Sequence, residues 1–473
     1  MLPNFFSSQI KKNFPFEPTG EQQSAMEKLG AFLFDRNGDS VFLLKGYAGT
    51  GKSSLVGAIV KTMNGLQQKA VLLAPTGRAA KVLAAYSGQN AYTIHKKIYR
   101  QKIFSNEPSG FVQAENLHKH TLFIVDEASM ISNDVPDSFI FGTGRLLDDL
   151  IHYIYSGEGC SLILLGDSAQ LPPVSQTDSP ALNVENLKGY GLEVHSVTLT
   201  QVVRQVESSG ILSNATLLRK ALDGNRTDEY PQIRLKNFPD VKKISGEELT
   251  EAIGDAYNRD GREETIIISR SNKRAGIFNN GVRNRILLRE EELTAGDLLM
   301  VAKNNYYWAK NEATMDFIAN GDLMQVLRVQ KTQELYDFHF CDVLVRFPDY
   351  DMEMEVKILL ETLRTDSPAL PKEMSDKLFY AVLADYEDVV GKREKMKLMK
   401  ENPYFNVIQV KYAYAVTCHK AQGGQWKNVF LDLSYAPREY LGIDYYRWLY
   451  TAFTRASERL FLINPAVELI ATE

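Results

Sequence analysis

The residues best suited to chemistry lie in a glycine-rich loop near position 50. The segment from Gly46 to Ser53 reads GYAGTGKS and matches the pattern G-x-x-x-x-G-K-[ST] in full. It follows an apolar run and precedes a stretch compatible with a helix, which is the context that this phosphate-binding motif requires. Glycines let backbone N–H groups turn toward phosphate oxygens, and the helix N-terminus adds positive potential. The residues that we expect around the phosphates are Gly46, Ala48, Gly49, Thr50, Gly51, Lys52, Ser53 and Ser54.

Within that loop, Lys52 would neutralise the β- and γ-phosphates, and the Ser53 hydroxyl would contact Mg²⁺. A second chemical feature is the acid pair Asp126 and Glu127, which ends the apolar run Leu122–Val125. Such a pair is often only the start of a solvated loop, but here a phosphate loop lies upstream. We expect Asp126 to hold Mg²⁺ through water and Glu127 to polarise the attacking water. This arrangement suits repeated hydrolysis of ATP better than phosphorylation of a small molecule.

Short apolar runs that are typical of buried parallel strands must position these residues. The first set is Val41–Leu44, Val71–Ala74, Leu122–Val125 and Ser161–Leu165, and the second is Thr265–Ser269, Ala413–Val416, Val429–Leu433 and Leu460–Ile463. Each set is enough for one doubly wound sheet, and 473 residues are too many for one core. The prediction is therefore an α/β protein with two parallel-sheet domains.

Two stretches interrupt this alternation of strands and helices. Residues 96–120 are polar and turn-rich, which predicts a hairpin inserted in the first domain. Residues 292–408 contain hairpin-like pairs, such as the two runs around the turn Pro348–Asp351, and then a charged helix near Val389–Lys400. We predict a first domain over 1–206, a second over 207–291 and 409–473, and a β-rich inserted domain over 292–408.

Several ordered motifs resemble those of the superfamily 1 helicases, in particular the RecD-like, Pif-type and phage Dda branch. They span nearly the whole chain: Thr19–Gln22, Ala74–Ala80, Thr93–His95, Gly166–Pro173, Leu199–Arg204, Val416–Gly423 and Tyr450–Ala456. The resemblance implies two RecA-like P-loop domains, with an SH3-like insertion in the second. It also implies an ATP-dependent motor that moves 5′→3′ on single-stranded DNA and unwinds duplexes.

The resemblance also assigns residues to the nucleotide, namely Gln22, Gln170, Arg204, Gln422, Gly423 and Arg455. By this analogy Gln22 reads adenine, Gln170 senses the γ-phosphate, and Arg204 and Arg455 act as arginine fingers. Two arginines delivered across a cleft stabilise charge on the leaving phosphate only when the cleft is closed. Closure of the cleft would thereby become coupled to hydrolysis.

Binding of a nucleic-acid strand without sequence preference needs cations and hydroxyls for phosphates, and flat faces for bases. The candidates from the matching motifs are Pro75, Thr76, Thr93, His95, Thr417, His419 and Lys420. Lys96 belongs to a basic run just before the predicted hairpin, where Phe104 or Phe111 would meet the duplex at a fork. An equally good interpretation is that these two aromatic residues only anchor the hairpin. Asn279 and Asn280 could contact the strand or simply lie on a helix surface.

Composition restricts the classes of protein that this chain can belong to. The formal net charge of −5 gives no support to nucleic-acid binding, although affinity follows the local field and not the total charge. The three cysteines are scattered without metal-ligand spacing, which argues against disulfides or zinc. No apolar run is long enough for a membrane span. The first sixteen residues contain no acid but also no arginine, so we expect no targeting role for them.

Three rival functions remain open at this point. Asp349 with Glu355 and Lys357 superficially resembles a metal-nuclease pattern, although the segment fits one tight hairpin. A P-loop switch acting on a protein partner and a translocase that unwinds poorly are the others. For the helicase we expect ATP and Mg²⁺ as cofactors, and single-stranded DNA and its junctions with duplex as substrates. A single-strand-binding protein is a candidate partner. We also expect a monomer that is cytoplasmic and associated with the nucleoid.

Overall fold

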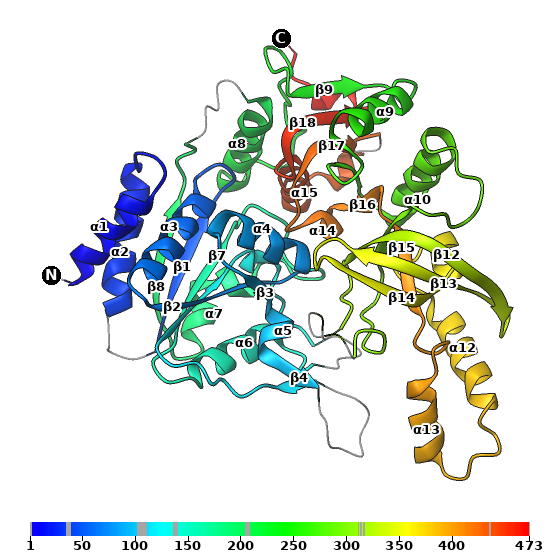
Figure 1. The fold of residues 1–473 in the computed structure, drawn as a ribbon. Helices are drawn as coiled ribbons and strands as arrows, with labels where there is room; N and C mark the ends of the chain where they lie inside the picture. Colours follow the sequence, from blue (N-terminus) through cyan, green and yellow to red (C-terminus); the bar gives the residue numbers. More distant parts are fainter. Residues whose placement is uncertain are drawn as a thin grey trace.

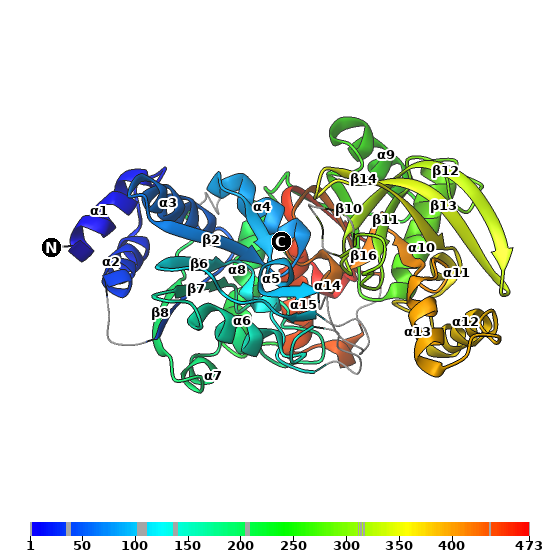
Figure 2. The same cartoon turned by 60° about the horizontal axis from the view of Figure 1, so that its bottom comes forward.

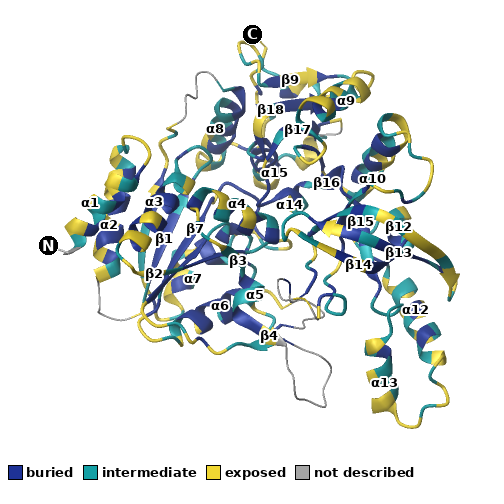
Figure 3. Ribbon diagram, viewed as in Figure 1, coloured by how far each residue is buried: buried dark blue, intermediate teal, exposed yellow. Residues whose placement is uncertain are grey.

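The computed structural model describes residues 2–34, 39–101, 111–135, 141–203, 209–310, 312, 315, 317–434 and 437–472. Two open parallel sheets with flanking helices lie side by side, and a closed barrel adjoins the second sheet (Figures 1 and 2). The predicted α/β class, with two RecA-like domains and a β-rich insertion, is confirmed. The central strands of both sheets are buried (Figure 3), as their apolar sequences require.

The first sheet has the strand order β3-β2-β6-β7-β1-β8, and its neighbouring strands run parallel. Its strands are β1 Ser40–Gly46, β2 Lys69–Ala74, β3 Ala91–Thr93, β6 Thr121–Val125, β7 Ser161–Gly166 and β8 Glu193–Leu199. Its helices are α1 Leu2–Asn13, α2 Gly20–Phe34, α3 Lys52–Gly65, α4 Gly77–Ser87, α5 Ile94–Ile98, α6 Leu146–Tyr155 and α7 Val184–Lys188. Since β7 lies between β1 and β6, the ends of these three strands bring the glycine-rich loop, the segment from Gly166 and the acid pair together.

The N-terminal helix α1 is an integral part of the first domain. Phe6, Ile10 and Phe14 are 2%, 0% and 8% exposed and share a core with α2 and α3. The spacing of four residues places the three side chains on one helical face. The acid-free N-terminal segment therefore has a packing role.

The second sheet has the order β16-β10-β17-β18-β9, again with parallel neighbours. Its strands are β9 Val241–Ile244, β10 Thr265–Ser269, β16 Ala415–Thr417, β17 Trp426–Asp432 and β18 Ala456–Ile463. Its helices are α8 Gly210–Asp223, α9 Leu249–Asp260, α10 Asn272–Gly281, α14 Cys418–Ala421 and α15 Ile443–Phe453, and a π-helical turn covers Val282–Ile286. Single 3-10 turns occur at Ala128–Met130, Pro180–Leu182, Arg438–Tyr440 and Val467–Leu469.

The insertion is a closed barrel of β11 Leu298–Val301, β12 Leu323–Leu335, β13 Phe338–Phe347, β14 Met352–Leu359 and β15 Ile408–Tyr412. Between β14 and β15 the chain forms α11 Glu361–Arg364 and a projecting pair, α12 Lys372–Ala384 and α13 Lys392–Glu401 (Figure 1). The predicted boundary at 408/409 is wrong by four residues, because β15 closes the barrel. Its side chains alternate between buried and partly buried, which is typical of a barrel strand.

The predicted hairpin in the first domain is present as β4 Tyr99–Gln101 paired antiparallel with β5 Phe111–Gln113. Its tip, with Phe104, lies outside the described residues. Within the described ranges, none of the helices has the length and apolar character needed to cross a membrane.

Candidate nucleotide and strand-binding sites

The glycine-rich loop has the conformation of a phosphate cradle. Gly49 and Gly51 have φ values of 78° and 85°, which favour glycine, and Gly51 is the N-cap of α3. The Lys52 ammonium donates to the carbonyl oxygens of Gly46 and Tyr47, the second at 3.1 Å. Backbone donors, a helix N-terminus and a lysine thus converge on one point, as a triphosphate requires.

The acid pair lies beside this loop and is linked to it through Tyr86 of α4. The Tyr86 hydroxyl donates to the Asp126 carboxylate and lies near the Ser53 hydroxyl, which affects the pKa of Tyr86. The other Asp126 oxygen accepts the Glu127 N–H at 2.8 Å. Because one hydroxyl reaches both Ser53 and Asp126, their oxygens lie close enough together to share one small ion. Oxygen donors of this kind suit Mg²⁺, which commonly takes its remaining ligands from phosphates and water.

The described residues contain no group of three or more His, Cys, Asp or Glu side chains that could enclose a metal ion by themselves. Burial raises the pKa of Glu127, and the carboxylates of Asp126 and Asp167 add to that effect, whereas Arg455 and Lys52 oppose it. A carboxylate with a raised pKa is well matched to taking a proton from water.

Gln22 is buried and bonds to the backbone of the glycine-rich loop. Its side chain is 1% exposed, donates to the Thr50 carbonyl at 2.9 Å and accepts the Thr19 N–H at 2.9 Å. Its amide therefore bonds to protein on both sides in this conformation, and adenine recognition by Gln22 stays a prediction. The neighbouring Glu21 accepts the N–H groups of Thr200 and Gln201 at 2.6 and 2.9 Å.

Through these contacts, Glu21 joins the segment that contains Gln22 to the end of β8, which precedes Arg204 in the sequence. Arg204 itself lies outside the described residues, so its predicted role as an arginine finger stays a prediction. Ser54 follows Ser53 in the first turn of α3, at the base of the loop.

Side chains from the second domain close over the loop at the domain boundary. The Tyr450 hydroxyl accepts the Ala48 N–H at 2.8 Å and donates to Asp167 at 2.6 Å. The next residue, Thr451, accepts the Leu171 N–H at 2.8 Å, and Gln422 donates to the Leu171 carbonyl at 2.7 Å. Both backbone groups of Leu171 are thus bonded to the second domain. The predicted coupling segment is clamped between the two sheets.

Arg455 lies in the same boundary and is 3% exposed. Its guanidinium donates to the carbonyls of Thr451 and Gly424, both at 3.2 Å, and it stabilises the charged form of Glu127. A buried guanidinium near the catalytic carboxylate fits the predicted arginine finger.

Gln170 lies on the first-domain side of this boundary and is 7% exposed; its buried Oε1 has no hydrogen-bond partner in the described structure. It lines a cavity of about 140 Å³ together with Asp167 and Ser129. A free acceptor there is suited to a water molecule or a nucleotide group. Gly423 packs closely against the first domain, since an added Cβ would lie 3.3 Å from Thr76 Oγ1, and its predicted contact with the nucleotide stays a prediction.

Most of the predicted strand-binding residues meet in two adjoining cavities. Pro75, Thr76, Thr93, His95 and Lys96 all line one of about 40 Å³, together with a barrel loop.

Thr417 and Lys420 line the second cavity, of about 50 Å³, which Asn279 also lines. The Lys420 ammonium donates to Asn320, which lines the first cavity, so the linings of the two cavities are in contact. His419 is exposed and lines neither cavity.

An aromatic cluster beside the first cavity contains Phe111 and His95. Phe111 is 6% exposed, with its ring centre 4.7 Å from Phe141 and 6.0 Å from Phe317 of the barrel loop. These contacts favour the interpretation that Phe111 anchors the hairpin over the one in which it meets the duplex. His95 lies 4.9 Å from Phe141, and burial lowers its pKa to about 4, so it is a neutral ring at pH 7.

The nuclease-like pattern does not form a metal site. Lys357 donates to Asp342 at 2.5 Å, whereas Glu355 accepts from Gln330 at 2.6 Å. The residues thus pair with separate partners along one hairpin. The nuclease interpretation loses its structural support.

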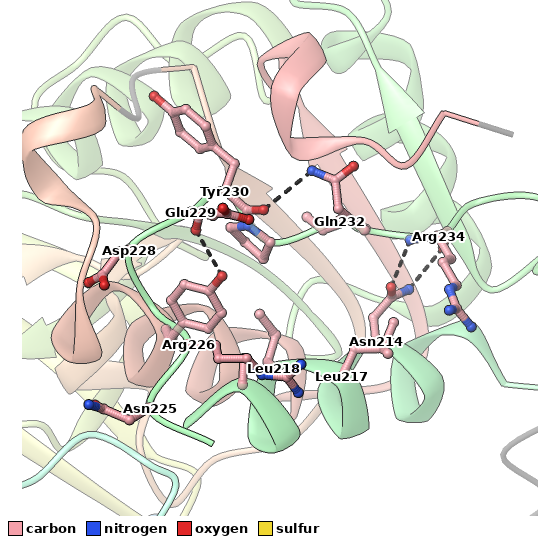
Figure 4. A pocket seen from close by; sticks show the side chains of 14 residues that line it. Asn214, Leu217, Leu218, Asn225, Arg226, Asp228, Glu229, Tyr230, Gln232 and Arg234 are labelled. Carbon is pink, nitrogen blue, oxygen red and sulfur yellow. Dashed lines mark hydrogen bonds between the residues drawn. The ribbon is translucent and has the colours of Figure 1, made fainter. Parts of the chain in front are cut away.

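Another cavity, of about 470 Å³, lies elsewhere, between α8 and residues 225–234 (Figure 4). Tyr446 of α15 lines it and donates to the Glu229 carbonyl at 2.8 Å, while Asn214 bonds to the backbone of Arg234. None of the predicted nucleotide or strand residues lines this cavity.

Comparisons with known proteins agree with this geometry. Residues 18–232 match the AAA domain family, and residues 412–463 match the UvrD-like helicase C-terminal domain. The two matches lie in the order that the two sheets require. Together with the curated relatives, they support a superfamily 1 helicase of the RecD-like and Pif-type branch.

Two curated relatives align with this chain over most of its length. The chain is 24% identical to the uncharacterized protein R530 of Acanthamoeba polyphaga mimivirus, with 94% of this chain and 99% of the relative covered. It is 23% identical to the ATP-dependent RecD2 DNA helicase of Deinococcus radiodurans over 95% of its own residues, but spans only half of that relative's length. A Bacteroides Pif1 helicase in complex with ADP-AlF3 and ssDNA has 16% identity and a TM-score of 0.46, covering 96% of this chain and 94% of that one.

Two functional side chains were not singled out from the sequence. Tyr86 lies in no motif, and only its contacts with Ser53 and Asp126 reveal it. Tyr450 belongs to a matching motif, but its pattern does not show that the hydroxyl crosses the domain boundary.

Proposed function

We propose that this chain is an ATP-dependent DNA helicase that translocates 5′→3′ on single-stranded DNA and couples ATP hydrolysis to unwinding. One observation carries the proposal: side chains of both domains meet at the nucleotide loop, and side chains of both domains also line the two adjoining cavities, the proposed strand path. A relative movement of the domains would thus change both sites together. The named RecD2 relative supports DNA as the substrate.

The residues of the nucleotide site have complementary roles in hydrolysis. Lys52 and the loop N–H groups would bind the phosphates, and Ser53 and Asp126 would hold Mg²⁺, which would supply Lewis-acid chemistry at the phosphates. Glu127 accepts a proton from the attacking water, and Arg455 stabilises charge on the transferred phosphate. Arg204 would add a second guanidinium, and Gln170 would bond to the γ-phosphate or the attacking water.

The strand path explains how hydrolysis becomes movement. Each domain has its own side chains for binding the phosphates of the strand. These are Thr76 and Thr93 on the first domain, and Thr417 and Lys420 on the second. When the cleft closes, the two phosphate-binding sites approach each other, and when it opens they separate. If the two sites bind the strand tightly in alternation, each cycle moves the strand in one direction.

Several finer features of the proposal rest on the resemblance. They are the 5′→3′ direction of movement, the monomeric state and a single-strand-binding protein as partner. Action on DNA of the nucleoid, in replication, repair or recombination, rests on the same resemblance. The hairpin, anchored through Phe111, would bring its tip to the junction of single strand and duplex. A translocase that unwinds poorly is the second candidate, since strand separation depends on that tip.

Steady-state ATP hydrolysis, with and without single-stranded DNA, tests the motor together with unwinding of 5′-tailed and 3′-tailed duplexes. We expect strong stimulation and unwinding from the 5′ tail alone. Glu127→Gln is the matched control, since it should bind ATP and DNA but not hydrolyse. Stimulation without unwinding would favour the translocase, and an ATPase indifferent to DNA would refute the motor.

A further inference from the structure

Helix α4 has two ends that face different sites. Its N-cap, Thr76, accepts the Ala79 N–H at 3.2 Å and lines the strand cavity. Near the same end, an added Cβ on Gly77 would lie 2.7 Å from the Tyr350 hydroxyl of the barrel, and one on Gly423 would lie 3.0 Å from Ala79 of this helix. The first turn of α4 therefore contacts the strand cavity, the barrel and the second domain.

The other end of α4 reaches the metal-binding residues. Tyr86 is one residue before the end of the helix, and its hydroxyl donates to Asp126 and lies near Ser53. Its backbone packs on the helix that follows the phosphate loop, because an added Cβ on Gly57 would lie 3.1 Å from the Tyr86 carbonyl. Tyr86 thus contacts the nucleotide site from within the first domain.

The helix between these ends is short and firmly packed. Eleven residues at 1.5 Å each span about 16 Å. Ala79, Ala80 and Leu83 are 4%, 5% and 0% exposed, and close-packed interiors transmit displacement instead of absorbing it. A shift of the first turn would therefore move Tyr86.

We propose that α4 links strand binding to the nucleotide site, and that Tyr86 is the positioning residue that aligns Ser53 and Asp126 when the strand is bound. The inference rests on the proposed function, because it takes the ligand at Thr76 to be single-stranded DNA. The hydroxyl is the acting group, since it donates to Asp126 and lies near the Ser53 hydroxyl. Binding of DNA and binding of Mg²⁺ with nucleotide are then thermodynamically coupled, and the coupling must be reciprocal.

The test is Tyr86→Phe, which keeps the ring and removes the hydroxyl. Binding of a fluorescent ADP analogue is titrated with Mg²⁺, with and without a thymidine oligonucleotide, and oligonucleotide binding is titrated with and without Mg²⁺ and ADP. In the native chain we expect DNA to lower the Mg²⁺ concentration for half-maximal nucleotide binding about fivefold or more. In the variant we expect that factor to fall to about one, and Mg²⁺-dependent nucleotide binding without DNA to weaken about tenfold.

Tyr155→Phe is the matched control, since it also removes a tyrosine hydroxyl bonded to protein in the first domain, 2.7 Å from the Ser40 carbonyl. It should keep the native coupling factor. A purely structural role of Tyr86 would instead lower thermal stability and oligonucleotide affinity together. An unchanged coupling factor in Tyr86→Phe would overturn the proposal, as would a factor of one in the native chain.

Two further measurements keep the outcomes distinct. If the native chain does not bind the oligonucleotide, the proposed function fails, whereas the Mg²⁺ titration without DNA still tests the alignment of Ser53 and Asp126. If Tyr86→Phe does not fold, hydrogen exchange in the native chain replaces it. DNA should then slow exchange at both ends of α4, and protection confined to the first turn would overturn the link.

Discussion

Removal of the Tyr450 hydroxyl is the sharpest perturbation of the domain boundary. Tyr450 is 1% exposed, and in Tyr450→Phe both the Ala48 N–H and the Asp167 carboxylate lose a buried partner. A neutral hydrogen bond contributes about 1 kcal/mol and one to a carboxylate about 2 kcal/mol. Opening of the cleft would let water reach both groups, so the closed form is destabilised by up to about 3 kcal/mol. That corresponds to about a hundredfold change in the closure equilibrium.

The assay measures closure and turnover in parallel. Dyes placed at Lys28→Cys and Asp255→Cys, both exposed and in different domains, report closure by energy transfer in the presence of an ATP analogue. We expect Tyr450→Phe to shift the population toward the open form and to lower the DNA-stimulated kcat, up to the same hundredfold. The control is Tyr445→Phe on the same helix, because the Tyr445 hydroxyl is buried without a hydrogen-bond partner. Unchanged closure in Tyr450→Phe, or equal loss in the control, would refute the reasoning.

Three other predictions follow from individual groups. Burial raises the pKa of Asp322 from 3.8 to about 7, so the folded chain holds a proton that the unfolded chain loses above pH about 4. Unfolding free energy should therefore fall as pH rises from about 4 to 7, by up to about 4 kcal/mol, and denaturant titrations should show a flatter profile in Asp322→Asn. Burial lowers the pKa of Lys420 to about 8, so oligonucleotide affinity should fall above pH 8 in the native chain but not in Lys420→Arg, as anisotropy titrations would show. Phe111→Ala removes a buried anchor worth about 3 kcal/mol, and should slow duplex unwinding while DNA-stimulated ATPase remains, whereas a parallel loss of both would contradict the anchoring role.

Features that depend on neighbouring residues were predictable from the sequence. The phosphate loop, the acid pair and the eight strands each have a local pattern, because phosphate binding needs particular residues in order and a buried strand needs a continuous apolar run. The barrel was predicted as β-rich, but its last strand was not assigned to it. Ile408–Tyr412 runs almost directly into β16, and its pairing with β11 and β14 assigns it to the barrel.

Features that depend on contacts between distant segments were not predictable. Tyr450 and Ala48 are 402 residues apart, and no pattern within either segment indicates that they bond. The sequence alone left open whether Phe111 meets the duplex or anchors the hairpin. It is buried because Phe317 of the barrel loop lies against it. Gln22 matched a motif, but its conformation depends on the backbone of Thr50.

The arrangement of α15 explains why closure should be a single event. Three contacting residues lie at or just beyond the end of this helix. Tyr450 bonds to the phosphate loop, Thr451 bonds to the coupling segment, and Arg455 interacts electrostatically with Glu127. A rigid helix cannot release one of these contacts without straining the others, so they form and break together. Each contact alone is worth about 1 to 2 kcal/mol, but three that act together separate the open and closed forms by several times that amount. Under the proposed function, hydrolysis would then occur in one conformation and product release in the other, which is the condition under which a strand held by both domains would move in one direction.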